Sequence, residues 1–326
     1  IDPGQQKQEA SAKYKAEPAF KDLLFEFWDK ELSKSPTAKD RLRLVEKDAL
    51  PLWSTRKVSS IKRRDAVLLL DEVRKRAPIT ANRLQGVLVR MFNFACERGI
   101  LDNSPLVGMK RGKENSRART LNDDEIRIIW NCLDLERKDI DIYVLTKLAI
   151  KTILLTGQRP GEVTGMKWKD LNGDWWTIPA AERKTREENR VPINPMLAEI
   201  IDQVKAISCD SSFVFLSPKY EEERPLTVGS LANAIRRHRK EMGINEQFTP
   251  HDLRRTCRTR LAEIGVEDVI AEKILGHKLQ GVLGIYNRHS YDAEKKNALL
   301  LWEKRLSEII GIAEPVSNII QFEVKK

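Results

Sequence analysis

Residues 155–168, LTGQRPGEVTGMKW, decide how the second half of this chain folds. The apolar residues 143–156 that lead into the motif are typical of a helix, and Gly157 is the residue type that most often follows a helix end. Pro160 suits the first turn of another helix. Arg159 is therefore predicted to lie in a tight corner between two helices, one turn before Glu162. A surface ion pair with Glu162 explains this arginine at least as well as a functional role.

The segments after this corner predict a β-hairpin and then further helices. WWTIP (175–179) and RVPI (190–193) have the composition of short strands, and the polar AAERKTREEN (180–189) joins them as a charged tip. Lys184 stands in this tip on a flexible stem that suits it to reach over a ligand, although an exposed lysine needs no such role. Helices are predicted within residues 228–243, 251–265, 266–276 and 291–311.

The first part of the chain predicts a small all-helical domain. Apolar residues with helical spacing mark a helix from Phe20, and a second such run from Leu84 is stopped by Gly99. Two more helices are expected between them. GMKRGKENSRART (108–120) has no apolar period and many basic side chains, which is typical of a domain boundary. We expect a solvated linker whose positive charge can also lie along a phosphate backbone.

The predicted fold is mainly α-helical with a small β-sheet or hairpin. The predicted organisation is a polar linker over residues 1–17, a helical domain over 18–107, a basic linker over 108–119, a mixed α/β domain over 120–311 and a tail over 312–326. The closing helix carries an apolar stripe that includes Leu299, Trp302 and Leu306. This stripe either packs on its own domain or docks on a neighbouring protomer.

Composition points to a polyanionic partner inside the cell. The chain has 41% hydrophobic and 33% charged residues and a formal net charge of +10, which favours nucleic acid first and an acidic membrane surface second. The longest apolar segment carries two lysines and is too short to span a bilayer. The cysteines are far apart and form no C-x-x-C pair, so we expect reduced cytoplasmic thiols and no zinc site: Cys96, Cys132, Cys209 and Cys257.

Two further motifs contain histidine, and the second also has a tyrosine. In FTPHDLRRT (248–256) His251 and Arg254 stand three residues apart in the first turns of a predicted helix, so they share one face. The free amides of that helix start favour an anion, and an arginine can hold a phosphate with two parallel hydrogen bonds. His277 follows Gly276 at the end of another helix, and Tyr286 comes nine residues later. Each feature alone is weak, but chance rarely supplies all of them together.

Taken together, the strings TGQRPGEVTGMKW, FTPHDLRRT, ILGH and YNRHSY resemble the tyrosine recombinases, or phage-type integrases. Residues 120–311 look like their catalytic domain, and the helical part before it is similar in size and position to their core-binding domain. The strings are most similar to integrases of satellite phages and genomic islands. Members of that subtype usually carry a further N-terminal domain that binds arm-type DNA sites, and the opening IDPG (1–4) resembles the junction after it.

The resemblance implies a role for each site residue. Arg159 and Arg254 would be the arginine pair and Tyr286 the nucleophile, with Tyr291 as a competitor that lies less well spaced from His277. The implied catalytic set, with a supporting acid, is Arg159, Glu162, Lys184, His251, Arg254, His277 and Tyr286. Lys184 is flanked by two arginines, which leaves its assignment open. The candidate DNA contacts are Lys110, Arg111, Lys113, Arg117, Arg236 and Arg237.

The implied reaction is attack of the tyrosine on a DNA phosphodiester, which leaves a 3′-phosphotyrosyl link and a free 5′-hydroxyl. No metal or nucleotide cofactor is expected, because the chain has neither an acidic cluster for Mg²⁺ nor a phosphate-binding G-x-x-x-x-G-K-[ST] loop. The implied partners are double-stranded DNA attachment sites, a tetramer of protomers, and DNA-bending or directionality factors. A DNA-binding regulator without cleavage and a type IB topoisomerase are the alternatives.

Overall fold

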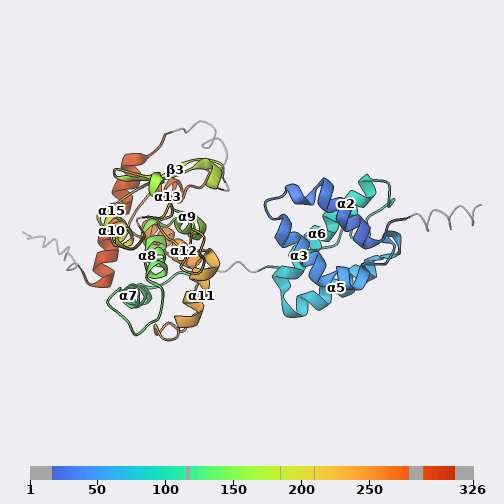
Figure 1. Cartoon of the computed structure of the whole chain (residues 1–326), viewed down its shortest axis with the longest axis horizontal. Helices are drawn as coiled ribbons and strands as arrows, with labels where there is room; N and C mark the ends of the chain where they lie inside the picture. Colours follow the sequence, from blue (N-terminus) through green and yellow to red (C-terminus); the bar gives the residue numbers. More distant parts are fainter. Residues whose placement is uncertain (1–16, 115–117, 184, 209, 279–288, 313–326) are drawn as a thin grey trace, which may run out of the picture. The chain divides into compact units, whose positions relative to one another are not determined.

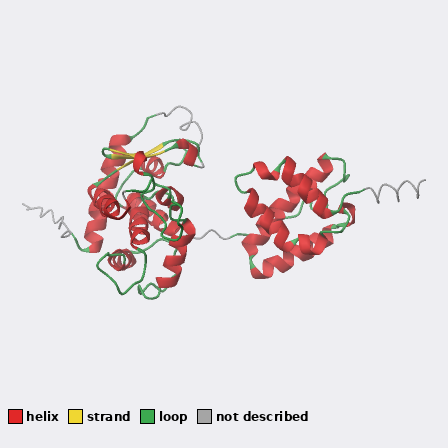
Figure 2. Cartoon of the chain, viewed as in Figure 1, coloured by secondary structure: helices red, strands yellow, loops and turns green. Residues whose placement is uncertain are grey.

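The computed structural model describes residues 17–114, 118–183, 185–208, 210–278 and 289–312 (Figure 1). The chain divides into two compact units, Ile1–Arg117 and Ala118–Lys326, each with a hydrophobic core of its own. Helices build the first unit, whereas the strands belong to the second (Figure 2). The predictions that fall outside the described residues concern residues 1–16, Arg117, Lys184, Cys209, Tyr286 and the tail from residue 313.

The first unit is organised around its longest helix. Its elements are α2 (Phe20–Lys30), α3 (Ala38–Asp48), α4 (Leu50–Trp53), α5 (Arg63–Arg76) and α6 (Pro78–Glu97), with short 3-10 turns at Leu32–Lys34 and Val58–Ser60. Helix α6 packs against α2, α3 and α5, because its apolar residues recur on several faces and are nearly all buried. Phe20 stacks edge-on against Trp53 at 5.3 Å between ring centroids. The predicted helices of this region are therefore confirmed, and Gly99 follows α6 with a φ of +69°.

The first part of the predicted basic linker is hydrogen-bonded to the first unit, and residue 121, just after the linker, is hydrogen-bonded to the second unit. On the first unit, the buried Asn82 side chain donates to Gly112 O at 2.8 Å and accepts from Gly112 N at 2.9 Å. On the second unit, the backbone amide of Leu121 donates to Thr256 Oγ1 at 2.9 Å. Residues 109–114 therefore lie along α6, and residue 121 lies against the helix that begins at Pro250.

A central apolar helix, α8 (Val144–Thr156), organises the second unit. Almost every side chain of α8 is buried, and the helix packs against α9, α10, α11, α12 and α15. The prediction of a helix ended by Gly157 is confirmed, since Gly157 has a φ of +66°. The other helices are α7 (Asp123–Cys132), α9 (Pro160–Thr164), α10 (Pro195–Ser208), α11 (Val228–His238), α12 (Pro250–Glu263), α13 (Asp268–Leu275) and α15 (Asp292–Ile310), with 3-10 turns at Trp168–Asp170 and Ala180–Glu182.

The sheet of the second unit has three antiparallel strands in the order β1-β2-β3. Strands β2 (Trp175–Ile178) and β3 (Asn189–Pro192) form the predicted hairpin, with Trp176 paired to Val191. Strand β1 (Leu171–Asn172) was not predicted, because two residues are too few to show an alternating pattern. Helix α10 was not predicted either. The mainly helical fold class with a small sheet is confirmed.

Helix α15 packs on its own unit. Leu299, Trp302 and Leu306 are buried in the core of the second unit, and Trp302 Nε1 donates to Leu154 O at 3.1 Å. Of the two interpretations of this apolar stripe, packing within the same chain is therefore the one that holds. The opposite face of α15 exposes Leu300 and Leu301.

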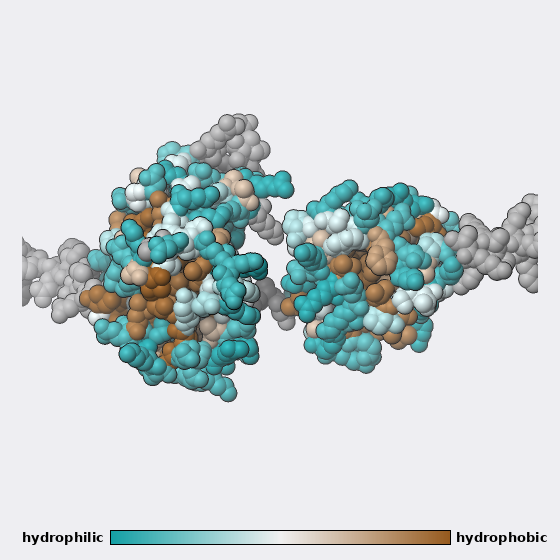
Figure 3. All heavy atoms as spheres, in the orientation of Figure 1, coloured by the Kyte–Doolittle hydropathy of each residue, from teal (hydrophilic) through white to brown (hydrophobic). Residues whose placement is uncertain are grey.

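The described surface is mainly hydrophilic in the view of Figure 3, with apolar residues gathered in patches on each unit. Phe25 on α2 is 70% exposed. Within the described ranges, no helix combines the length and the apolar composition that crossing a membrane requires.

Trp302→Ala is expected to lower the free energy of unfolding by about 3–5 kcal/mol, because it empties a fully buried site next to α8. Its neighbour Leu301 is 53% exposed, so Leu301→Ala serves as the control and should change stability by less than about 0.5 kcal/mol. Scanning calorimetry of both variants checks the difference. Equal effects would contradict the packing of α15 on its own unit.

Candidate active site

The site is built around the corner between α8 and α9. Gly157 has a left-handed backbone there, and a Cβ on it would lie 2.9 Å from Cys257 Sγ and 3.0 Å from Leu275 Cδ2. Both the conformation and the lack of space therefore require glycine. The next side chain, Gln158, is fully buried and donates to Ile274 O at 2.8 Å, which ties the corner to the end of α13.

Arg159 leaves this corner as the residue before α9 and pairs with Glu162. Its Nη1 donates to Glu162 Oε1 at 2.7 Å, and its backbone amide donates to Glu162 Oε2 at 3.1 Å. Arg159 therefore forms the predicted ion pair with Glu162. This ion pair does not exclude a functional role, because the arginine side chain stays 27% exposed while the carboxylate is almost fully buried.

Arg183, which sequence reasoning treated only as a neighbour of Lys184, is a buried part of the same cluster. Its Nε donates to Glu162 Oε1 at 3.0 Å, and its Nη2 donates to Gly276 O at 2.7 Å. Burial raises the pKa of Glu162, but the hydrogen bonds from Arg183 and Arg159 outweigh this and hold it below its usual value. Arg183 packs so closely on Gly276 that a Cβ at residue 276 would collide with the guanidinium, a contact that the sequence does not reveal.

Helix α12 supplies two of the predicted residues. The Asp252 carboxylate accepts from Thr249 N at 2.8 Å and closes the first turn, in which His251 is exposed. Arg254, one turn later, is 3% exposed and its guanidinium donates to Gly157 O at 2.8 Å and to Leu275 O at 3.0 Å. The Arg254 side chain therefore fastens the α8–α9 corner to the end of α13.

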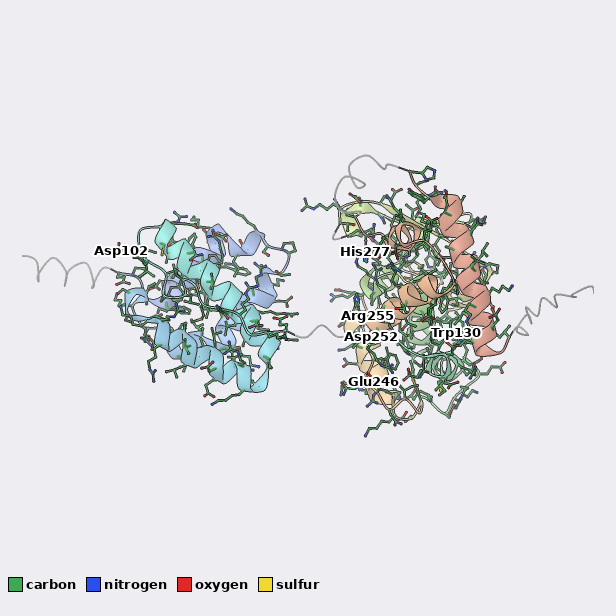
Figure 4. The ribbon with its side chains drawn as sticks, turned by 180° about the vertical axis from the view of Figure 1, so that it is seen from behind. Asp102, Trp130, Glu246, Asp252, Arg255 and His277 are labelled. Carbon is green, nitrogen blue, oxygen red and sulfur yellow. The ribbon has the colours of Figure 1, made fainter. Side chains whose placement is uncertain are left out.

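His277 completes the cluster from the end of α13. The helix ends at Gly276, whose φ of +62° turns the chain so that His277 Nε2 lies 2.8 Å from Arg254 Nη2. The other ring nitrogen, Nδ1, contacts the Glu272 carboxylate. Figure 4 labels His277, which follows α13, and also Asp252 and Arg255, which form an ion pair on α12.

The charges in this region act on one another. Burial and then the positive charge of Arg159 lower the pKa of Arg254 to about 10. Although His251 reaches the surface, partial desolvation of its ring and then the charges of Arg254 and Arg255 lower the pKa of His251. At neutral pH Arg254 is therefore cationic and His251 is neutral. Such a cluster favours an anionic ligand, because a phosphate would relieve the repulsion between the arginines.

The structure thus brings five of the predicted site residues into one region: Arg159, Glu162, His251, Arg254 and His277. Lys184 and Tyr286 lie outside the described residues. Among the candidate DNA contacts, the exposed ones on the first unit are Lys110, Arg111 and Lys113, and those on α11 are Arg236 and Arg237. Their roles stay predictions. In the described part of the chain, no three His, Cys, Asp or Glu side chains are close enough to hold a metal ion.

Arg183→Met is expected to lower the free energy of unfolding by about 3 kcal/mol, because it removes a buried cation from Glu162 and leaves Gly276 O without a donor. Arg186 lies three residues on in the same hairpin and is exposed. Arg186→Met is therefore the matched control, with an expected change below about 0.5 kcal/mol. Urea unfolding followed by circular dichroism measures both variants. An unchanged free energy of unfolding in Arg183→Met would contradict a role for Arg183 in holding this cluster together.

Family models match most of the chain. The Phage integrase family model matches residues 119–293, and the Phage integrase central domain model matches residues 20–111. Prophage integrase IntA of Escherichia coli K12 is 25% identical over 272 residues, which are 81% of this chain and 63% of that protein. Prophage integrase IntZ of the same strain is 26% identical over 281 residues, or 84% of this chain and 67% of that protein. The chain therefore spans about two thirds of the length of these relatives.

Solved structures show the same fold. A lambda integrase tetramer bound to a Holliday junction matches with a TM-score of 0.69 at 19% identity, over 87% of this chain and 81% of that one. The Tn1549 transposon integrase in complex with circular intermediate DNA matches with a TM-score of 0.61 at 17% identity, over 86% of this chain and 98% of that one. With the two family models, these matches lead to one conclusion: the chain belongs to the phage integrase family.

Proposed function

We propose that this protein is a site-specific DNA recombinase, an integrase that cuts and rejoins DNA through a 3′-phosphotyrosyl intermediate during integration or excision of a mobile element. Membership of the phage integrase family supports this proposal. The observation that carries it is the meeting of Arg159, Arg254 and His277 from three separate segments around one cationic region. Binding alone does not require such a set of polar groups at one place.

In the proposed reaction Arg159 and Arg254 hold the non-bridging oxygens of the scissile phosphate. Arg254 makes its three contacts with Gly157 O, Leu275 O and His277, and among the described residues none of these partners is a carboxylate. Its charge is therefore available to the extra negative charge that develops on the pentacoordinate phosphorus. Stabilisation by such preoriented groups is usually the largest contribution to catalysis of this kind.

Protons are moved by the histidine and lysine side chains. A phenol with a pKa near 10 is a poor nucleophile at neutral pH, so Tyr286 needs a base as it attacks phosphorus. His251 fits this role because its lowered pKa keeps the ring neutral and able to accept the proton. Lys184 would protonate the leaving 5′-oxygen, and His277 would donate a hydrogen bond to a non-bridging oxygen. The link to Tyr286 conserves the phosphodiester energy, so rejoining requires no ATP.

The two units would divide the work on DNA. In this proposal the first unit binds core-type DNA, the second carries the chemistry, and the exposed Lys110, Arg111 and Lys113 contact phosphates with Arg236 and Arg237. Lambda integrase has been solved as a tetramer on a Holliday junction. By analogy, this protein would act as a tetramer on two attachment sites in the cytoplasm, at the nucleoid, with DNA-bending or directionality factors as possible helpers. The mobile element would be a satellite phage or genomic island.

Covalent capture tests the nucleophile. A duplex that spans the boundary of the mobile element and carries a nick beside the cleavage position should trap wild-type protein on DNA, because the short strand diffuses away before rejoining. Tyr286→Phe should give no covalent complex, whereas Tyr291→Phe, altered at the residue before α15, should still give one. Gel electrophoresis under denaturing conditions measures the complex. Capture by Tyr286→Phe but not by Tyr291→Phe would move the nucleophile, and tight specific binding without any capture would favour a regulator.

The pH dependence of cleavage tests His251. Because its pKa is lowered, the ring stays neutral further into the acid range than an ordinary histidine, and cleavage should fall only as pH drops through that lowered value. His251→Ala should reduce the rate at neutral pH on the order of a hundredfold and remove this acid limb. His238→Ala, at the end of α11, is the control and should leave the profile unchanged. An unchanged acid limb in His251→Ala would assign the base elsewhere.

A further inference from the structure

Glu272, to which neither the motifs nor the proposed reaction gives a role, contacts the imidazole of His277. Both residues come from the end of α13, and the Glu272 Oε2 atom lies against His277 Nδ1. The other carboxylate oxygen, Oε1, accepts from Arg258 Nε at 2.9 Å, and Arg258 also pairs with Asp268 at 2.6 Å. The carboxylate is therefore held between a fixed arginine and the histidine ring.

These contacts determine where the His277 proton lies in the DNA-free protein. A guanidinium can only donate, so Nε2, which faces Arg254 Nη2 at 2.8 Å, must be the accepting nitrogen. Burial raises the pKa of Glu272, but hydrogen bonds from Arg258 and His277 outweigh this and keep the pKa below its usual value. The ionised carboxylate can only accept, so Nδ1 must carry the proton. Both neighbours thus select the neutral tautomer with hydrogen on Nδ1.

This tautomer has a consequence for any anion that binds the arginines. Donation of a hydrogen bond by His277 toward a phosphate requires a proton on Nε2, and that nitrogen has only a lone pair while Arg254 faces it. A phosphate oxygen would draw the Arg254 N–H groups to itself and free the lone pair. A proton taken from solvent at Nε2 would then give an imidazolium, which the Glu272 carboxylate stabilises through Nδ1–H.

We propose that Glu272 is a positioning residue that fixes His277 as the Nδ1–H tautomer and supplies the negative charge for proton uptake at Nε2 when an anion binds. The identification of that anion as the scissile phosphate rests on the proposed function. The tautomer and the uptake themselves depend only on the contacts of α12 and α13.

The surroundings of the ring explain why one carboxylate matters. Four cations lie near His277. They are Arg254 and Arg258 on α12, Arg183 in the hairpin, and Lys278, the residue after His277. Asp268 and Glu187 are occupied by Arg258 and Lys278, at 2.6 and 2.9 Å. Among the described residues, Glu272 is the carboxylate that contacts the ring itself. Without Glu272, the contacts found for an imidazolium at residue 277 in the described part of the chain would include Arg254 but no carboxylate.

A second histidine–glutamate pair, His238 and Glu241, lies outside the site and serves as a control for His277 and Glu272. On α11, His238 Nδ1 lies 2.7 Å from Glu241 Oε2, but no arginine contact to its Nε2 is found among the described residues. The protein has four histidines, so ¹⁵N-histidine labelling gives few enough signals to assign each ring by substitution. The ¹⁵N shifts of Nδ1 and Nε2 report the tautomer and the protonated fraction directly, in the full chain and without DNA.

The experiment compares wild type with Glu272→Gln, Glu272→Ala and Glu241→Gln, each titrated with inorganic phosphate near pH 7. Wild-type His277 should show hydrogen on Nδ1 and become protonated as phosphate is added. Glu272→Gln keeps an acceptor for Nδ1–H but loses the charge, so the tautomer should persist while the ratio of protonated to neutral ring with phosphate falls at least about tenfold. Glu272→Ala removes the acceptor as well as the charge, so the Nδ1–H tautomer, then selected by Arg254 alone, should be less populated, and protonation with phosphate should fall at least as far as in Glu272→Gln. Glu241→Gln should affect His238 alone.

Hydrogen on Nε2 in the wild type, no response of His277 to phosphate, or an equal response in Glu272→Gln would each overturn the proposal. Thermal unfolding of the same samples shows whether each variant is folded, and the retained tautomer of Glu272→Gln separates loss of charge from loss of structure. Covalent capture through Tyr286 does not enter this experiment. A protein that fails to cut DNA would therefore contradict the proposed function while the NMR result still decides the role of Glu272.

Discussion

The second unit depends on one buried cation that has carbonyl oxygens as partners. Arg254 is 3% exposed, and its guanidinium bonds to the oxygens of Gly157 and Leu275. These residues stand at the ends of α8 and α13, where unpaired carbonyls give a helix its partial negative charge. Two helix ends thus take the place of a carboxylate. Arg254 is held firmly by these carbonyl oxygens, and no carboxylate among its contacts in the described residues compensates its positive charge. A site that binds phosphate requires such a charge.

The end of α13 shows how closely the cluster is connected. Its last carbonyls accept from side chains of three different elements: Ile274 O from Gln158 and Asn189, Leu275 O from Arg254, and Gly276 O from Arg183. The corner after α8, the hairpin and α12 therefore meet at one helix end. His277 follows directly, so its position is set by groups that also position Arg159 and Arg254.

Local patterns predicted much of this arrangement. Gly157 and Pro160 marked a helix break, the spacing of His251 and Arg254 placed them in one helix start, and the two apolar runs around the polar tip marked the hairpin. Strand β1 is too short to show a period, and it exists because β2 pairs with it. Arg183 and Glu272 were missed for a related reason. The partners of Arg183 are distant in sequence, and the contact of Glu272 with His277 forms because Gly276 turns the chain after α13, which charge and spacing do not reveal.

The sharing of Glu162 between two arginines has a consequence for the lifetime of the protein. One carboxylate serves Arg159 and Arg183, while Arg254 lies close enough for Arg159 to lower its pKa, so positive charge is in surplus when no anion is present. A ligand that binds only the folded form and relieves this repulsion stabilises the fold by mass action. Copies with an anion bound at this cluster would thus resist local opening and proteolysis better than free copies. Turnover would then clear unbound protein first.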